Sequence, residues 1–155
     1  MSIPSSKFSC IKSYHDFPCS HRQWQHNGHC KFVHGYSRSF TFWFIAKNLD
    51  INGFVVDFSS LKPLETKLKN QFDHTFLINQ DDPLLTYWEK LNELKAIDLR
   101  IMENVGMESS SQLIWKWAND YLKDKDNGRT CCFKAESKEN ESNKALFESI
   151  PSWYI

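Results

Sequence analysis

The chain has 155 residues, and its 19 Lys and Arg residues balance its 19 Asp and Glu residues, so the formal net charge is zero. A chain of this length fits one domain with one modest core, and we expect a single domain over residues 1–155. The balanced charge, with basic residues scattered along the chain, argues against a general binder of nucleic acid or of a membrane surface.

The cysteines and the lack of long apolar segments favour a cytoplasmic protein. Five Cys residues are an odd number, and two of them, Cys131 and Cys132, are adjacent, which suits no common disulfide framework. No apolar run approaches the ~18 residues that span a bilayer, and the first ten residues hold no apolar stretch of a secretory signal. Six Trp residues suit either an aromatic core or a surface buried between copies of the chain.

The first third of the chain predicts β-structure. Residues 7–19 alternate loosely and predict a strand, the polar and His-rich residues 20–31 predict a loop, and residues 32–48, dense in Phe, Trp, Val, Ile and Thr, predict a long strand. Turn residues follow, and the apolar residues 54–58 then make 32–58 a candidate β-hairpin.

Helices are predicted in the middle of the chain. Ser59 and Ser60 are candidate N-caps of a helix whose apolar residues recur at helical spacing: Leu61, Leu64, Leu68 and Phe72. Residues 72–83 look irregular, Pro83 suits the first turn of a short helix that ends near Leu94, and residues 96–102 alternate like a strand.

The last third predicts a helix and a second hairpin. Residues 109–123 form an amphipathic pattern that begins with Ser, residues 130–137 resemble a strand, and residues 145–150 a last short strand. The sum is an α+β domain built from a hairpin, two helices and a hairpin.

Histidines gather near the end of the first strand. Five of the six His residues fall between positions 15 and 34. Residues i and i+2 of a strand point to the same face, so His34 and Tyr36 would point to one place, where His21 from the preceding strand could meet them. Neutral imidazoles brought together from neighbouring strands are common zinc ligands, but surface histidines of a polar loop explain the same spacing.

Four further residues are candidates for chemistry. The thiol of Cys30, near these histidines, could be held as a thiolate base or could be a small buried apolar group. Asp73 could orient His74 for proton transfer, unless the two neighbours point apart. Glu136, at the end of a strand, could accept two hydrogen bonds from an amidine-like ring edge or could be solvated.

Together these residues form an ordered set of motifs: F-x-x-S-H (17–21), C-x-x-x-H-G (30–35), G-F-V-V-D-F (53–58), F-D-H-x-F-L-x-N (72–79) and E-S (136–137). From about residue 7 to 137 the chain resembles the 6-pyruvoyl-tetrahydropterin synthase family, which includes the 6-carboxytetrahydropterin synthase of the queuosine pathway. The resemblance implies the tunnelling fold, in which two β-hairpins with two helices between them form an oligomeric β-barrel. It also implies a homo-oligomer, trimer or hexamer, with active sites between subunits.

The resemblance further implies a lyase that acts on 7,8-dihydroneopterin triphosphate, and the C-x-x-x-H spacing resembles the branch that makes 6-carboxy-5,6,7,8-tetrahydropterin. The roles it carries over are zinc ligation by His21 and His34, proton abstraction by Cys30, proton transfer by Asp73 and His74, and pterin binding by Glu136. The alternatives are a 6-pyruvoyl-tetrahydropterin-type synthase and a divergent, zinc-poor pterin-binding paralogue.

The chain departs from the family at its third zinc ligand. The family motif H-G-H is H-G-Y here, with Tyr36 in the place of the last His. A phenol binds a metal as phenolate, and its unperturbed pKa is about 10. Three possibilities remain open: Tyr36 ligates zinc directly, another His replaces it (His15, His26 or His29), or zinc binding is weak or lost.

Overall fold

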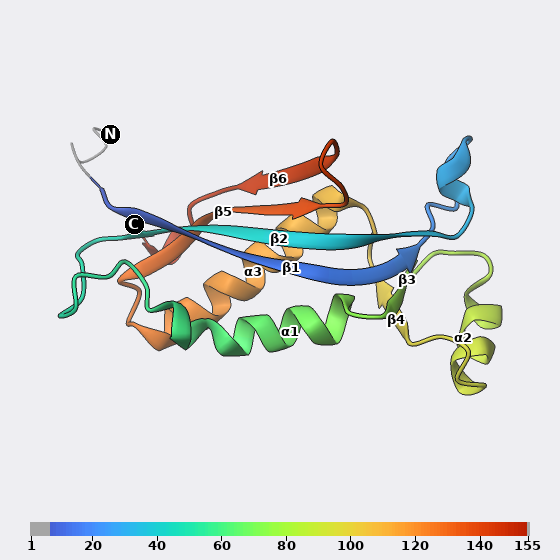
Figure 1. Cartoon of the computed structure of the whole chain (residues 1–155), viewed down its shortest axis with the longest axis horizontal. Coiled ribbons are helices and arrows are strands. Elements are labelled where there is room, and N and C mark those ends of the chain that lie inside the picture. The colour runs from blue at the N-terminus through green and yellow to red at the C-terminus, as the bar shows by residue number, and fades with distance from the viewer. Residues whose placement is uncertain (1–6, 155) are drawn as a thin grey trace.

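A long antiparallel hairpin forms the centre of the structure, a computed structural model that describes residues 7–154 (Figure 1). Strands β1 (Ser9–His21) and β2 (His34–Ala46) pair from Ser9 opposite Ile45 to His21 opposite His34. A bulge interrupts the pairing between Tyr14 and Phe17. Residues 1–6, part of the segment for which the sequence predicts no secretory signal, lie outside the described part of the chain.

Two more pairs of strands extend this hairpin into a six-stranded sheet of order β4-β3-β1-β2-β5-β6. Strands β3 (Thr75–Asn79) and β4 (Leu99–Met102) are parallel to their neighbours, whereas β5 (Thr130–Lys138) and β6 (Lys144–Glu148) are antiparallel. The prediction of an irregular segment at 72–83 is wrong, because it contains β3. All five residues of β3 are buried, so the strand lacks the alternation that marks a half-exposed one.

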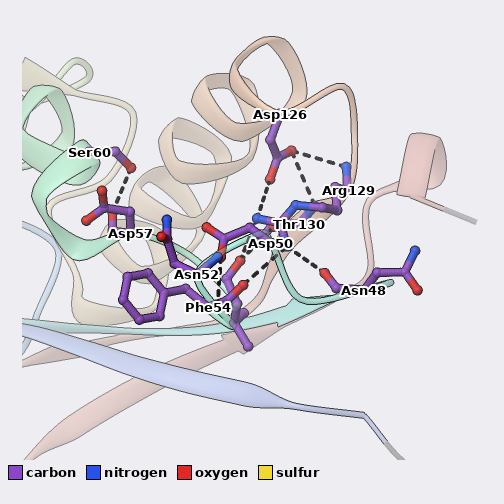
Figure 2. Close-up of polar contacts among 10 residues, drawn as sticks. Asn48, Asp50, Asn52, Phe54, Asp57, Ser60, Asp126, Arg129 and Thr130 are labelled. Atoms are coloured by element: carbon purple, nitrogen blue, oxygen red, sulfur yellow. Dashed lines mark hydrogen bonds and ion pairs between the residues drawn. The ribbon is translucent and has the colours of Figure 1, made fainter.

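The predicted hairpin at 32–58 is also wrong, because β2 pairs with β1 and β5 and residues 54–58 form no strand. A side chain holds this segment instead (Figure 2). Arg129 donates hydrogen bonds to the carbonyls of Asn48 (2.6 Å) and Val55 (2.9 Å). Within the loop, Asp50 Oδ1 accepts from the N–H of Phe54 at 2.9 Å. These bonds satisfy backbone groups that would otherwise need a strand partner.

Two of the helices cover one face of the sheet (Figure 1). Helix α1 (Lys62–Phe72) buries Leu64, Leu68 and Phe72, as its spacing predicts, and α3 (Met107–Lys125) crosses the same face. Helix α2 (Leu85–Glu93) lies near β4, at one end of the sheet. The structure therefore has two hairpins, β1–β2 in place of the predicted 32–58 and β5–β6 where the second was predicted. Three helices rather than two separate them in the described chain.

The core lies between α1, α3 and the sheet and is rich in aromatic rings. Phe40, Phe42 and Phe44 project from alternate positions of β2 and are fully buried. The ring of Phe40 lies 4.5 Å from that of Phe72 on α1, centroid to centroid. The opposite face of the sheet is more polar, with the hydroxyls of Ser13 and Thr41 2.8 Å apart. None of the helices in the described residues is long and apolar enough to cross a membrane.

Candidate functional site

Three aromatic side chains meet where β1 and β2 end at the loop between them. His21 and His34 are direct cross-strand partners, and their ring centroids are 4.4 Å apart. Tyr36 follows on the same face of β2, with its ring centroid 5.8 Å from His34 and 6.5 Å from His21. The structure therefore brings together the three residues that the sequence proposes as metal ligands, and we call them the three-ring cluster.

A buried arginine lies directly behind the three-ring cluster. Arg38 is fully buried, and its Nη2 donates to His21 Nδ1 (3.2 Å) and to the carbonyl of Val105 (3.1 Å). Its Nη1 donates to Ser110 Oγ at 3.2 Å. Burial, followed by the charges of Arg38 and His34, lowers the pKa of His21 to about 3. His21 is therefore neutral at ordinary pH.

Arg38 is not among the residues that the sequence motifs propose for the site, although the sequence carries a signal for it. Arg38 occupies the same face of β2 as His34, Tyr36 and Phe40, in the even-numbered positions that point toward the helices. A charged residue at an apolar position of an alternating strand indicates a buried polar contact.

His34 has the geometry of a metal-binding histidine. Its Nδ1 lies 2.7 Å from the carbonyl oxygen of Phe32. A carbonyl only accepts, so the proton is on Nδ1 and Nε2 keeps a free lone pair. In histidines that bind zinc through one ring nitrogen, the other ring nitrogen commonly donates a hydrogen bond of this kind, which orients the ring.

His21 and Tyr36 do not complete a zinc site with His34. A guanidinium only donates, so the hydrogen bond from Arg38 uses the lone pair of His21 Nδ1 and leaves the proton on Nε2. A neutral imidazole in this form offers no nitrogen to a metal. Within residues 7–154, no group of three His, Cys, Asp or Glu side chains is placed to hold a metal ion. In this arrangement none of the three alternative histidines lies in such a group with His21 and His34: His15, His26 and His29.

The Asp73–His74 pair lies at the turn between α1 and β3. His74 has a positive φ of 57°, and its N–H donates to the carbonyl of Pro18 at 2.7 Å. The two neighbouring side chains meet there, with His74 Nδ1 2.6 Å from Asp73 Oδ1. The His74 side chain is 82% exposed. Asp73 therefore holds the Nδ1 proton and leaves Nε2 open to a reacting group.

An open pocket lies beside this pair, and Tyr36 is the one member of the three-ring cluster that lines it. The pocket has a volume of about 520 Å³ and is lined by both Tyr36 and His74. Cys19 and Thr75, cross-strand partners on β1 and β3, form part of the wall between them. A small molecule in this pocket would therefore contact residues from the β1–β2 end and from the Asp73–His74 turn.

The remaining two candidates, Cys30 and Glu136, do not line this pocket. Cys30 is half-buried in the short 3-10 turn His29–Lys31 of the β1–β2 loop, where its carbonyl accepts from Gln23 N at 2.8 Å. Glu136 is opposite Thr41 of β2, on the sheet face away from the three-ring cluster. Thr41 is five residues beyond Tyr36, which corresponds to roughly 17 Å along a strand. One chain therefore does not bring Glu136 to the three-ring cluster.

A polar network that the sequence did not predict anchors the loop that carries Cys30. Arg22 makes two hydrogen bonds to Asp82 of the β3–α2 connection, at 2.7 and 2.8 Å, and the Asp82 side chain is fully buried. Gln23 donates to Asn104 and accepts from Asn79, both at 2.9 Å. The first residues of the loop are therefore tied to the chain that follows β3 and β4.

We expect Asp82→Asn to lower the free energy of unfolding at neutral pH by about 1.5–3 kcal/mol, because Arg22 loses its charged acceptor. Burial disfavours the charged carboxylate, but hydrogen bonds from Arg22 and Leu84 N–H outweigh it and hold the pKa of Asp82 below its ordinary 3.8. A lowered pKa stabilises the fold above 3.8, and that stabilisation is lost as the pH falls through the folded-state value. Urea unfolding measured from about pH 7 to about pH 2 should therefore show that the free energy of unfolding falls less with acid in Asp82→Asn than in the parent. An equal fall in the two proteins would contradict the stabilising role of the Asp82 charge.

Comparisons with known proteins agree on one family. The family model described as 6-pyruvoyl tetrahydropterin synthase matches residues 10–149. The 6-carboxy-5,6,7,8-tetrahydropterin synthases of Rickettsia conorii and Rickettsia typhi are 34% and 35% identical over 68 residues, 43% of this chain and 49% of each relative. The chain thus spans about half the length of the curated relatives it matches.

Solved structures show the same fold at low sequence identity. An uncharacterised protein from Wolinella succinogenes has a TM-score of 0.79 at 18% identity, over 94% of this chain and 100% of that chain. The 6-pyruvoyl tetrahydropterin synthase of Plasmodium falciparum has a TM-score of 0.60 at 19% identity, over 91% of this chain and 98% of that chain. These similarities confirm the α+β tunnelling fold that the sequence predicts.

Proposed function

Because the chain belongs to the 6-pyruvoyl tetrahydropterin synthase family, we propose that it is a lyase that converts 7,8-dihydroneopterin triphosphate to 6-carboxy-5,6,7,8-tetrahydropterin. The observation that carries the proposal is the Asp73–His74 contact of 2.6 Å beside a pocket that Tyr36 also lines. The Rickettsia relatives are named 6-carboxy-5,6,7,8-tetrahydropterin synthases, which supports this branch of the family over the 6-pyruvoyl branch.

His74 and Cys30 move protons in the proposed reaction. The Nε2 atom of His74 takes up or delivers a proton, and the Asp73 carboxylate stabilises the imidazolium that forms. Cys30 acts as the base that removes a proton from the substrate side chain, and triphosphate leaves by elimination. The product keeps one of the three side-chain carbons, so water then adds at the first of them and its bond to the second breaks, which releases the other two carbons as acetaldehyde. No proposed step passes through zinc, because the hydrogen bond from Arg38 leaves His21 without a free nitrogen.

We propose that a second copy of the chain supplies the pterin anchor. Glu136 lies on the far face of the sheet from the three-ring cluster, so the site needs Glu136 of a neighbouring copy to hold the ring edge. The two edge strands, β4 and β6, are short, and each has one side without a partner strand within the described chain. Pairing along these sides between copies would close the sheet into a barrel. The proposed assembly is a homo-oligomer, trimer or hexamer.

The direct test is to incubate the purified full chain with 7,8-dihydroneopterin triphosphate and identify the pterin product by mass spectrometry. The expected product is 6-carboxy-5,6,7,8-tetrahydropterin, and a 6-pyruvoyl product would assign the other branch. Cys30→Ala should abolish turnover, whereas Cys10→Ala, a change at the other end of β1, should leave turnover unchanged. Cys30→Ala turnover at the parent rate would contradict the role of this thiol.

A second candidate function is a pterin-binding protein without turnover. Tyr36 in the three-ring cluster and Arg38 behind it favour this candidate, because both depart from a site of three neutral imidazoles. Tight binding of the pterin substrate with no product would select it. Any product of the expected mass would exclude it.

A further inference from the structure

Arg38 is a buried cation that forms no ion pair with any residue of the described chain. Its hydrogen-bond partners are all neutral: Ser110 Oγ, Val105 O and His21 Nδ1. Its Nε is buried with no partner among the described residues. Burying a charge is unfavourable unless opposite charge or full hydrogen bonding offsets the loss of solvation. Simple packing of the strand therefore does not explain an arginine at this position.

The contact with His21 has a definite chemical consequence. Arg38 can only donate, so it selects the form of His21 with the proton on Nε2, which makes Nε2 a hydrogen-bond donor. His34 takes the opposite form, because Phe32 O holds the proton on Nδ1 and leaves Nε2 an acceptor. With the phenol of Tyr36, the three-ring cluster then offers a donor, an acceptor and a hydroxyl. Such a set is the complement of a ligand hydroxyl group rather than of a metal ion.

We infer that Arg38 takes the place of a metal as the cation of the three-ring cluster, and that it keeps zinc away by fixing His21 as a hydrogen-bond donor. Removing the guanidinium frees Nδ1 of His21 to carry the proton, and Nε2 then becomes available as a ligand beside His34. The inference concerns the same site as the proposed function but involves no turnover. The proposed enzymatic activity can therefore be disproved while the inference about Arg38 holds, and the reverse is also true.

The first test observes His21 in the unaltered full chain. Long-range ¹H–¹⁵N NMR of protein labelled at histidine distinguishes the two neutral forms of each ring, and His21→Gln identifies the His21 signals by their loss. We expect His21 with a protonated Nε2 and an unprotonated Nδ1, and no change when an equimolar amount of zinc is added. A protonated Nδ1, or His21 signals that move to zinc-bound positions, would overturn the inference.

The second test removes the guanidinium. Competition with a chromogenic chelator should show that Arg38→Met binds zinc about 10- to 100-fold more tightly than the parent. Hydrogen-bond partners of metal-binding histidines change metal affinity by this factor, and here the partner that is removed opposes binding. Arg100→Met is the matched control, because Arg100 binds Asp98 and the Asn70 carbonyl instead of a ring of the cluster. Equal zinc affinity of parent and folded Arg38→Met would overturn the inference. If Arg38→Met does not fold, the NMR measurement on the parent still decides.

Discussion

Replacement of His74 by alanine is expected to lower kcat for 7,8-dihydroneopterin triphosphate by about 100- to 10,000-fold, the usual contribution of a positioned acid–base group. His74 is exposed, and its Nδ1 is held by Asp73 at 2.6 Å, so its role would lie in proton transfer at Nε2 rather than in the fold. KM should change much less than kcat, because the lost interaction is made mainly in the transition state. Steady-state kinetics on the full chain measures both constants.

Two further variants make this test specific. His15→Ala removes another histidine, which bonds Ser39 on the other face of the sheet, and should leave kcat unchanged. Asp73→Asn should lower kcat by less than His74→Ala, because the ring remains but its orientation and the charge that stabilises the imidazolium are lost. A His74→Ala protein with the parent kcat would refute the relay.

Replacement of Phe72 by alanine is expected to lower the free energy of unfolding by about 3–5 kcal/mol. Phe72 is fully buried at the last residue of α1, and its ring packs 4.5 Å from Phe40 and 6.3 Å from Trp117. It also lies 5.8 Å from the Arg38 guanidinium, so the cavity would open beside a buried charge. Urea denaturation at neutral pH measures the loss.

Tyr87→Ala is the matched control for Phe72→Ala. Tyr87 lies on α2 and is 68% exposed, so its truncation should change the free energy of unfolding by less than about 0.5 kcal/mol. A loss below about 1 kcal/mol in Phe72→Ala would mean that the core collapses around the gap, and it would contradict the tight packing described here.

Several elements follow from patterns within short stretches of sequence. The apolar spacing that predicts α1 is the spacing that buries Leu64, Leu68 and Phe72. Alternation along 32–48 predicts β2, and the same alternation places His34 and Tyr36 on one face. The identity of the strand's partner is not contained in that pattern, which is why the hairpin at 32–58 is wrong.

Other elements depend on residues distant in sequence. Strand β3 is buried on both faces, so its residues show no period of two. Residues 54–58 remain a loop because Arg129, more than 70 positions away, binds their carbonyls. The Arg22–Asp82 pair joins residues 60 positions apart. No local pattern reports such contacts.

In the candidate site, too, some features follow from local sequence and others depend on contacts between residues distant in sequence. Residue types and their order indicated the pterin-synthase family, the members of the three-ring cluster and the Asp73–His74 pair, because these depend on local spacing and on motifs. Only the folded chain places Arg38 against His21, and a guanidinium there decides which imidazole nitrogen is protonated. That protonation, and with it the fit of a metal, depends on a hydrogen bond 3.2 Å long between residues 17 positions apart. Spacing tells which side chains share a face, whereas donors and acceptors are assigned only when the strands and helices pack.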